Sequence, residues 1–208
     1  MSAGETPPLL ELRGVAAGGT RLDLTLEPGE RVAVLGGEGS GKTRLLKVMA
    51  GLLPVAEGRL LWEGVDLAAL PAGRRAKGIG VLFREPGTRF LCATPGEEIG
   101  LGLPEGSAAT LVGEAMAWSG LEPALTGTPW TRLSASQRYR GAMAVLHAAS
   151  VRLWLVDEPG VSLSESGEAD FADRLLTLCR NQNKTSVIFT SREARALRFA
   201  ERVIPLAD

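Results

Sequence analysis

One stretch of this chain has the residue types and spacing of a phosphate-binding loop. GGEGSGKT meets the pattern GxxxxGK[ST], with Gly36, Gly41, Lys42 and Thr43 in the defining positions. In this pattern the backbone curls around a β-phosphate, the lysine reaches the β- and γ-phosphates, and the hydroxyl ligates Mg²⁺. The stretch therefore predicts a site for a nucleoside triphosphate and Mg²⁺, formed by Gly36, Gly37, Glu38, Gly39, Ser40, Gly41, Lys42 and Thr43.

Two adjacent carboxylates later in the chain could complete such a site. The apolar run VRLWLV is followed by Asp157 and Glu158. A carboxylate at the end of a strand beside the loop can hold the hydrated metal, so Asp157 is a candidate Mg²⁺ ligand together with Thr43. Glu158 could orient and deprotonate an attacking water, which makes it the candidate catalytic base. Taken alone, DEP more often only ends a strand, and the phosphate loop is what favours the catalytic interpretation.

The segments around the loop have the order that a phosphate site needs. RVAVL, residues 31–35, predicts a buried strand, and TRLLKVMAG after Lys42 has a helical pattern that can end at Gly51. Strands are also expected for the alternating run from Leu22 to Leu26, for residues 79–83 and for VRLWLV, TSVIFT and RVIPL. Helices are expected for residues 107–119 with Ser107 as cap, for 136–149 and 165–180, and from Arg192. Strands that alternate with helices predict an α/β fold with a mainly parallel sheet flanked by helices.

The composition limits the classes of function. The 208 residues carry 23 lysines and arginines against 24 acidic residues. This balance lacks the positive field that sequence-independent nucleic-acid binding needs, so we expect no nucleic-acid partner. Cys92 and Cys179 have no neighbouring cysteine or histidine, and predict neither a zinc site nor a disulfide framework. The sequence has no secretory signal and no apolar run of about 20 residues, so work at a membrane would depend on another chain.

A third motif connects these features to a known family. LSASQRYRGAMAVLHAAS, residues 133–150, precedes the Asp157 strand and resembles the LSGGQ signature and following helix of ABC-type ATPases. Together with the phosphate loop and the DEP strand, the resemblance covers nearly the whole chain. It implies a P-loop NTPase fold of ABC type in a single domain, residues 1–208. The core would be residues 1–83 and 137–208 with an N-terminal antiparallel β part, and an inserted helical subdomain would occupy about 84–136.

The resemblance also implies ligands and partners. In ABC-type ATPases two subunits enclose two ATP molecules, each held by one phosphate loop and by the signature of the other subunit. A homo- or heterodimer is therefore implied, with Ser134 and Gln137 at the nucleotide of the partner. A transmembrane transporter subunit would hold the dimer at the inner, cytoplasmic face of the membrane. Phe90, Leu91 and Pro95 are apolar enough to form part of the contact with that subunit.

One subgroup of the family is also indicated. The stretches FREPGTRF and TPGEEIGLGL resemble a segment of the energy-coupling factor type, whose ATPases drive the uptake of cobalt, nickel and vitamins. The cargo implied by this resemblance is a metal ion or a vitamin.

Several positions depart from the family pattern, and the departures predict slow hydrolysis. Arg84 stands where the family has a glutamine that touches the metal and the attacking water; a cation there would compete with Mg²⁺, or else pair with the γ-phosphate or with Glu158. Ser191 replaces a histidine that contacts the γ-phosphate. Ser164 replaces an aspartate that links the two sites across the dimer, and Ala135 and Ser136 replace two glycines of the signature. GVAAGG lacks the aromatic that stacks on adenine. Arg84 and Ser191 are still expected at the nucleotide.

Three functions fit this combination of motifs and departures. The first is an ATP-binding subunit of a membrane importer, with slow or partner-dependent hydrolysis. The second is a nucleotide-dependent clamp or regulator, which binds ATP and associates without significant hydrolysis. The third is a phosphotransferase on the same phosphate loop, but it leaves LSASQ unexplained.

The remaining charged and aromatic residues have structural interpretations. Arg192, Arg195 and Arg198 recur every three residues and predict a solvated helix face. The other expectations are a charged turn for Arg74, Arg75 and Lys77, a packed or partly exposed helix position for His147, and separate packing for Trp62, Trp118, Trp130 and Trp154.

Overall fold

A parallel sheet forms the centre of the molecule, with its strands in the order β6-β7-β8-β3-β9. The computed structural model describes residues 7–17, 19–86, 90–101, 103 and 108–206. The strands of this sheet are β3 (Arg31–Leu35), β6 (Ile79–Leu82), β7 (Leu153–Asp157), β8 (Thr185–Thr190) and β9 (Arg202–Pro205). Every residue of β7 and β8 is buried, as parallel strands covered on both faces require.

A second, antiparallel sheet has the order β2-β1-β4-β5. Its strands are β1 (Leu10–Ala17), β2 (Thr20–Leu26), β4 (Arg59–Trp62) and β5 (Val65–Asp66). Leu22, Leu24 and Leu26 are buried while the residues between them are exposed, because successive side chains of a strand point to opposite faces. The structure thus confirms the predicted N-terminal antiparallel β part.

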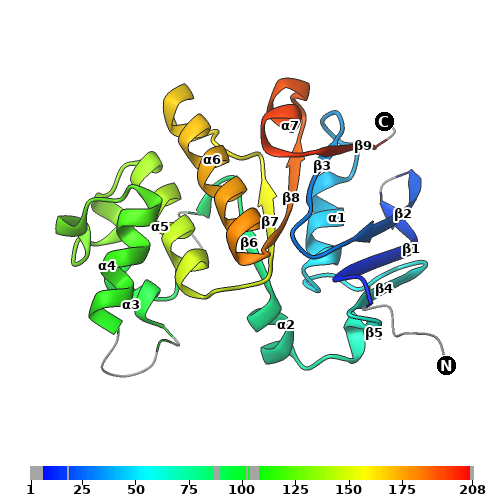
Figure 1. Cartoon of the computed structure of the whole chain (residues 1–208), viewed down its shortest axis with the longest axis horizontal. Coiled ribbons are helices and arrows are strands. Elements are labelled where there is room, and N and C mark those ends of the chain that lie inside the picture. Colours follow the sequence, from blue (N-terminus) through cyan, green and yellow to red (C-terminus); the bar gives the residue numbers. More distant parts are fainter. Residues whose placement is uncertain (1–6, 18, 87–89, 102, 104–107, 207–208) are drawn as a thin grey trace.

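Helices cover both faces of the parallel sheet (Figure 1). Helix α1 (Lys42–Met49) packs with the antiparallel sheet on one face, where its Leu45, Leu46 and Met49 share a core with β3, β7 and β8. Helices α5 (Ala135–Ala148), α6 (Glu165–Gln182) and α7 (Glu193–Phe199) contribute to the core of the other face. The structure therefore confirms the predicted α/β fold.

The remaining helices are short or lie at one end of the molecule. Helices α3 (Pro95–Gly100) and α4 (Ala108–Ser119) pack on α5 around a small core of their own, far from the antiparallel sheet (Figure 1). Helix α2 (Ala72–Gly78) precedes β6, and short 3₁₀ helices cover Leu67–Ala69, Pro123–Leu125 and Trp130–Arg132. The boundary of the helical insert at residues 84 and 136 stays a prediction.

Two sequence-based expectations about local structure were wrong. Arg74, Arg75 and Lys77 lie in α2 and do not form a turn, because Pro71 fixes an extended N-cap from which a helix can start. Trp118 and Trp154 do not pack separately, since their rings meet edge to face at 5.7 Å. The expectation for His147 is confirmed, because it is half-buried and stacks on Trp118 at 4.3 Å.

Two further features bear on the sequence-based expectations. The expected cap at residue 107 lies outside the described residues. Within the part of the chain that the structure describes, no helix is long and apolar enough to cross a membrane.

Candidate nucleotide-binding site

The phosphate loop lies between β3 and α1 and depends on glycines for its shape. Gly41 has a φ of 91°, in the left-handed region that favours glycine, and it immediately precedes α1. At Gly36 a Cβ atom would lie 2.5 Å from the Oγ of Ser40, so a side chain there would collide with the loop itself. The glycine positions of the motif therefore correspond to real conformational and steric requirements.

The side chain of Lys42 folds over the loop that precedes it. Its Nζ donates a hydrogen bond of 2.8 Å to the carbonyl oxygen of Gly36 and another to that of Gly37, and lies 3.4 Å from the Oγ of Ser40. The ammonium group of Lys42 thus donates to carbonyl oxygens of the loop the hydrogen bonds that it could otherwise donate to a phosphate. This placement puts the positive charge within the loop, where the sequence predicted it.

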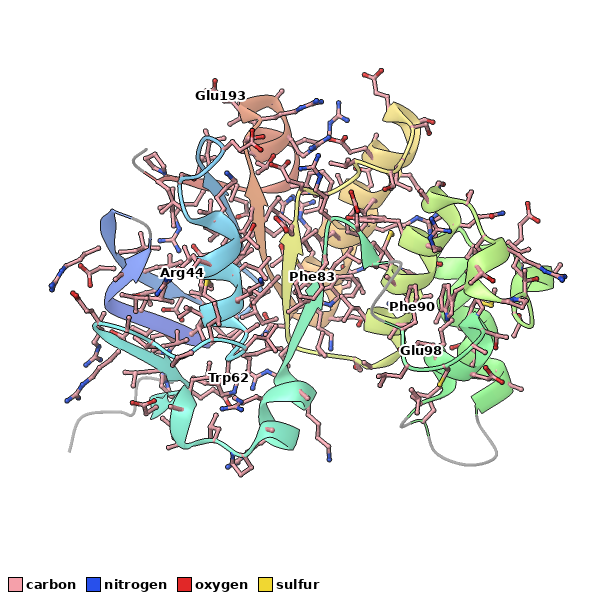
Figure 2. All side chains as sticks on the ribbon, turned by 180° about the vertical axis from the view of Figure 1, so that it is seen from behind. Arg44, Trp62, Phe83, Phe90, Glu98 and Glu193 are labelled. Atoms are coloured by element: carbon pink, nitrogen blue, oxygen red, sulfur yellow. The ribbon has the colours of Figure 1, made fainter. Side chains whose placement is uncertain are left out.

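A cavity of about 540 Å³ joins the loop to the carboxyl ends of the neighbouring strands. Parallel strands of an α/β sheet bring such ends together, and ligands of these folds bind there. Phe83 follows β6 near the middle of the molecule (Figure 2), and Arg84 is the next residue of the chain. The residues that line the cavity are Glu38, Gly39, Gly41, Lys42, Thr43, Arg44, Arg84, Asp157, Glu158 and Ser191.

Asp157 is the carboxylate best placed to hold a metal ion. It ends β7, is 9% exposed, and shares the cavity with Thr43. Burial and the neighbouring charge of Glu158 raise the pKa of Asp157, while Arg84, Lys42 and Lys47 oppose that rise. No cluster of three or more metal-binding side chains occurs among the described residues, so a metal here would need phosphate oxygens as further ligands. One carboxylate, one hydroxyl and phosphates form the kind of donor set that Mg²⁺ uses.

Glu158 directly follows β7, and three hydrogen bonds hold its carboxylate, two of them from residues at the end of β8. Its Oε1 accepts from the backbone N–H of Ser191 at 2.8 Å, and its Oε2 accepts from Thr190 Oγ1 at 3.0 Å and Arg195 Nη1 at 3.1 Å. Burial on its own would raise the pKa of Glu158, but the hydrogen bonds from Ser191 and Thr190 and the charge of Arg195 outweigh burial and leave the pKa lowered. The backbone of Glu158 itself has a positive φ of 45°, uncommon for a non-glycine residue.

Arg195 is a site residue that the sequence interpretation missed. It was expected on a solvated face, but it is 7% exposed and forks onto Glu168, with Nε–Oε1 at 3.1 Å and Nη2–Oε2 at 2.9 Å. The expectation holds for Arg192 and Arg198, which are exposed. The available signal was the helical spacing of Ala196 and Phe199, which places Arg195 on the buried face of α7.

The signature residues lie outside the cavity. Ser134 caps α5, because its Oγ accepts from the backbone N–H of Gln137 at 3.2 Å while Gln137 Oε1 accepts from the N–H of Ser134 at 2.8 Å. These two side chains form a reciprocal capping box. Ser164 likewise caps α6, accepting from the N–H of Gly167 at 3.2 Å. The structure therefore does not bring Ser134 or Gln137 to the phosphate loop of the same chain.

The apolar segment before α3 is mostly packed. Phe90 stacks on Trp130 with ring centroids 3.6 Å apart, and Pro95 is buried in the first turn of α3, so two of the three residues predicted for the membrane contact already pack within the chain. Leu91 is 86% exposed. Glu98 Oε2 accepts from the backbone N–H groups of Leu91 and Cys92 at 2.8 and 2.6 Å, and Figure 2 shows Phe90 and Glu98 together in this region. The segment thus presents Leu91 on a fixed backbone.

Known proteins with related sequences agree with this geometry. A family model described as ABC transporter matches residues 20–161. The thiamine import ATP-binding protein ThiQ of Cereibacter sphaeroides is 35% identical over 196 residues, which are 90% of this chain and 82% of that protein. The Fe(3+) ions import ATP-binding protein FbpC of Mesorhizobium japonicum is 34% identical over 214 residues, which cover all of this chain and 59% of that protein.

Solved structures share the fold. The cassette MJ0796, in a dimeric post-hydrolysis state bound to ADP and Pi, superposes with a TM-score of 0.84 at 23% identity, over 95% of this chain and 94% of that one. The protein cbiO1 from Clostridium perfringens, part of the transporter complex cbiONQ, superposes with a TM-score of 0.82 at 21% identity, over 96% and 85%. At these identities the likeness speaks for the fold alone, and the subgroup resemblance stays a prediction. From the family match and the sequence relatives together, the chain belongs to the ABC transporter family of ATP-binding proteins.

Proposed function

We propose that this chain is the ATP-binding subunit of an ABC importer, with ATP and Mg²⁺ bound at the cavity beside the phosphate loop. The observation that carries the proposal is the meeting of Lys42, Thr43, Asp157 and Glu158 in that one cavity. Thr43 and Asp157 would hold Mg²⁺, which on binding neutralises charge on the phosphates. Lys42 and the N–H groups of the loop would hold the phosphates, and Glu158 would take a proton from water as the catalytic base.

The arrangement of the signature supports a dimer. Ser134 and Gln137 lie at the N-terminus of the long helix α5, outside the cavity of their own chain, and a helix N-terminus favours a phosphate. In the proposed homo- or heterodimer they meet the nucleotide of the partner. A transmembrane subunit would hold the dimer at the cytoplasmic face of the membrane. The cargo would be a metal ion or a vitamin, a proposal supported by the thiamine and Fe(3+) importers among the relatives.

We expect the hydrolysis to be slow. Arg84 brings a fixed positive charge into the cavity where Mg²⁺ would bind, and Ser191 is too short to place a side-chain donor on a γ-phosphate. Loss of one preorganised electrostatic contact typically lowers the rate by about 10²- to 10³-fold. The site therefore keeps the groups that grip a nucleotide and lacks part of the environment that accelerates its cleavage.

Replacement of the candidate base tests the proposed hydrolysis. Glu158→Gln keeps the shape of the side chain but removes its charge, and we expect phosphate release by the purified chain to fall about tenfold. The measurement is phosphate release from Mg-ATP, by the chain alone and by its mixture with a second ATP-binding subunit encoded beside it. Glu165→Gln, on the exposed start of α6, is the matched control and should leave the release unchanged.

A second function, the nucleotide-dependent clamp, is favoured by one observation. Both oxygens of Glu158 already accept hydrogen bonds within the chain, which makes the carboxylate less available to water. If phosphate release is the same with and without Glu158→Gln, alone and in the mixture, the clamp replaces the ATPase as the better account.

The exposed Leu91 offers a test of the membrane contact. Leu91→Gln keeps the size of the side chain but removes its apolar surface, and we expect the affinity for the transmembrane subunit to fall about tenfold. Co-purification and a binding titration measure the effect, and thermal unfolding should not change. Leu197→Gln on α7, where the leucine is 65% exposed, is the control. Equal binding by the Leu91 variant and the parent chain would place the contact elsewhere.

A further inference from the structure

Arg195 joins two buried carboxylates. Its Nε and Nη2 face the two oxygens of Glu168, and its Nη1 faces Oε2 of Glu158. The three side chains are between 7% and 14% exposed, so water screens these charges poorly. A guanidinium is planar and always charged, and its fork suits a two-pronged contact with one carboxylate and a single contact with another. Arg195 is therefore fixed by Glu168 and directed at Glu158.

The hydrogen bonds of Glu158 leave little of its carboxylate for a water molecule. A carboxylate oxygen has two lone pairs, and Oε2 already accepts from Thr190 and Arg195. Oε1 accepts from the backbone of Ser191. The side chain is thus anchored on both oxygens, and removing its arginine contact would free one lone pair on Oε2.

Gly160 is fitted to Glu168 in the same network. It has a φ of 78°, and a Cβ atom there would lie 2.6 Å from Cγ and 3.0 Å from Cβ of Glu168. The N–H of Gly160 also donates to the hydroxyl of Tyr139 on α5, at 3.3 Å. A side chain at this position would collide with Glu168, and the positive φ is unfavourable for any residue but glycine. Gly160, Glu168 and Arg195 therefore form one interdependent structural unit.

We propose that Arg195 is a positioning residue that restrains hydrolysis by anchoring the carboxylate of Glu158, with Glu168 and Gly160 as its supports. The proposal rests on the proposed function, in which Glu158 is the catalytic base. The charged groups that face Glu158 or line its cavity are Asp157 on β7, Glu168 on α6, Arg195 on α7, and Glu38, Lys42, Arg44 and Arg84 along the cavity.

A charge exchange tests the proposal. The double variant Arg195→Glu with Glu168→Arg keeps an ion pair between these two positions but replaces the cation beside Glu158 with a carboxylate. We expect hydrolysis at pH 7 to rise about threefold to tenfold, with the affinity for a fluorescent ATP analogue unchanged. The gain should appear in kcat, with the KM for ATP unchanged. Adding Glu158→Gln to the exchange should remove the gain.

Two controls make the test specific. The exchange Arg152→Glu with Glu63→Arg reverses an exposed ion pair next to the start of β7, whereas Glu158 follows the end of that strand, and it should leave the rate unchanged. If the main exchange prevents folding, as thermal unfolding would reveal, Arg195→Lys is measured in its place. A lysine has the charge but no fork to bridge both carboxylates, so a smaller rise in rate is expected.

The outcomes separate the two proposals. A chain that binds the ATP analogue but hydrolyses ATP no faster after the exchange, or after Arg195→Lys where that variant is used, overturns the role of Arg195 and leaves ATP binding intact. A slower rate overturns it as well, because Arg195 would then support the active arrangement. A parent chain that fails to bind the analogue overturns the proposed function itself.

Discussion

Replacing Arg84 by glutamine and Ser191 by histidine together is expected to raise the rate of ATP hydrolysis about 100-fold. Both residues line the cavity with Asp157 and Glu158. The positive charge of Arg84 would compete with Mg²⁺ at Asp157, where it already opposes the rise in pKa that burial and Glu158 cause. Glutamine removes the charge and keeps a polar group, and the imidazole of a histidine reaches further into the cavity than a serine hydroxyl. Ser191 is exposed, so the larger ring has space.

Each replacement should act on a different quantity. Arg84→Gln alone is expected to lower the Mg²⁺ concentration needed for half-maximal activity, whereas Ser191→His alone is expected to raise kcat. Steady-state phosphate release over a range of Mg²⁺ concentrations measures both. Arg180→Gln with Thr177→His replaces an exposed arginine by glutamine and an exposed hydroxyl residue by histidine on α6, and should have no effect. If the double replacement at positions 84 and 191 is as slow as the parent chain, these departures from the family pattern are not what limits turnover.

The parts of the molecule that the sequence predicted well are those encoded locally. The buried strands β3 and β7 are short runs of apolar residues next to the loop and next to Asp157. The phosphate loop is defined by glycines whose backbone conformations and close contacts no other residue would allow, as at Gly36 and Gly41. In such segments a few neighbouring residues determine the local structure, so a pattern within one sequence is sufficient to predict it.

The parts that were missed depend on partners far away in the chain. Arg195 has the spacing of a solvated face, but its partners Glu168 and Glu158 lie 27 and 37 residues earlier. Phe90 was predicted as part of a contact with another subunit, and its packing on Trp130 within the chain was not foreseen. A buried charge or a stacked ring is favourable only when its partner is in place. The fold supplies those partners, and a helical period or a run of apolar residues does not identify them.

Arg195 is expected to influence the same hydrolysis rate as Arg84 and Ser191, but through a different contact. Arg84 acts where the metal would bind, Ser191 acts where the γ-phosphate would lie, and Arg195 acts on the base. Because Arg84 and Ser191 line the cavity and Arg195 contacts Glu158, which lines it as well, their effects on the rate are not expected to be additive. The exchange of Arg195 and Glu168 in the background of Arg84→Gln and Ser191→His should therefore reveal whether the base becomes limiting once the other two contacts are restored.

Removing the ammonium of Lys42 is expected to weaken ATP binding about 100-fold. In the chain described here the Nζ group donates to the carbonyl oxygens of Gly36 and Gly37 inside the loop, so the charge is already at the place where phosphates would bind. A hydrogen bond to a charged group contributes about 1.5 to 3 kcal/mol, which corresponds to roughly 10- to 150-fold in affinity. Lys42→Ala should leave weak binding, because the N–H groups of the loop and the start of α1 still attract an anion.

Titration of a fluorescent ATP analogue measures this loss, and Lys77→Ala is the matched control. Lys77 lies exposed on α2, and its removal changes the net charge of the chain by the same amount. Binding that weakens equally in both variants would mean that long-range charge alone attracts the nucleotide. If Lys42→Ala binds as tightly as the parent chain, the cavity between β3, β7 and α1 is not the triphosphate site. If only Lys42→Ala loses affinity for the ATP analogue, and the parent chain hydrolyses ATP slowly, then nucleotide binding and nucleotide hydrolysis depend on different groups of the site.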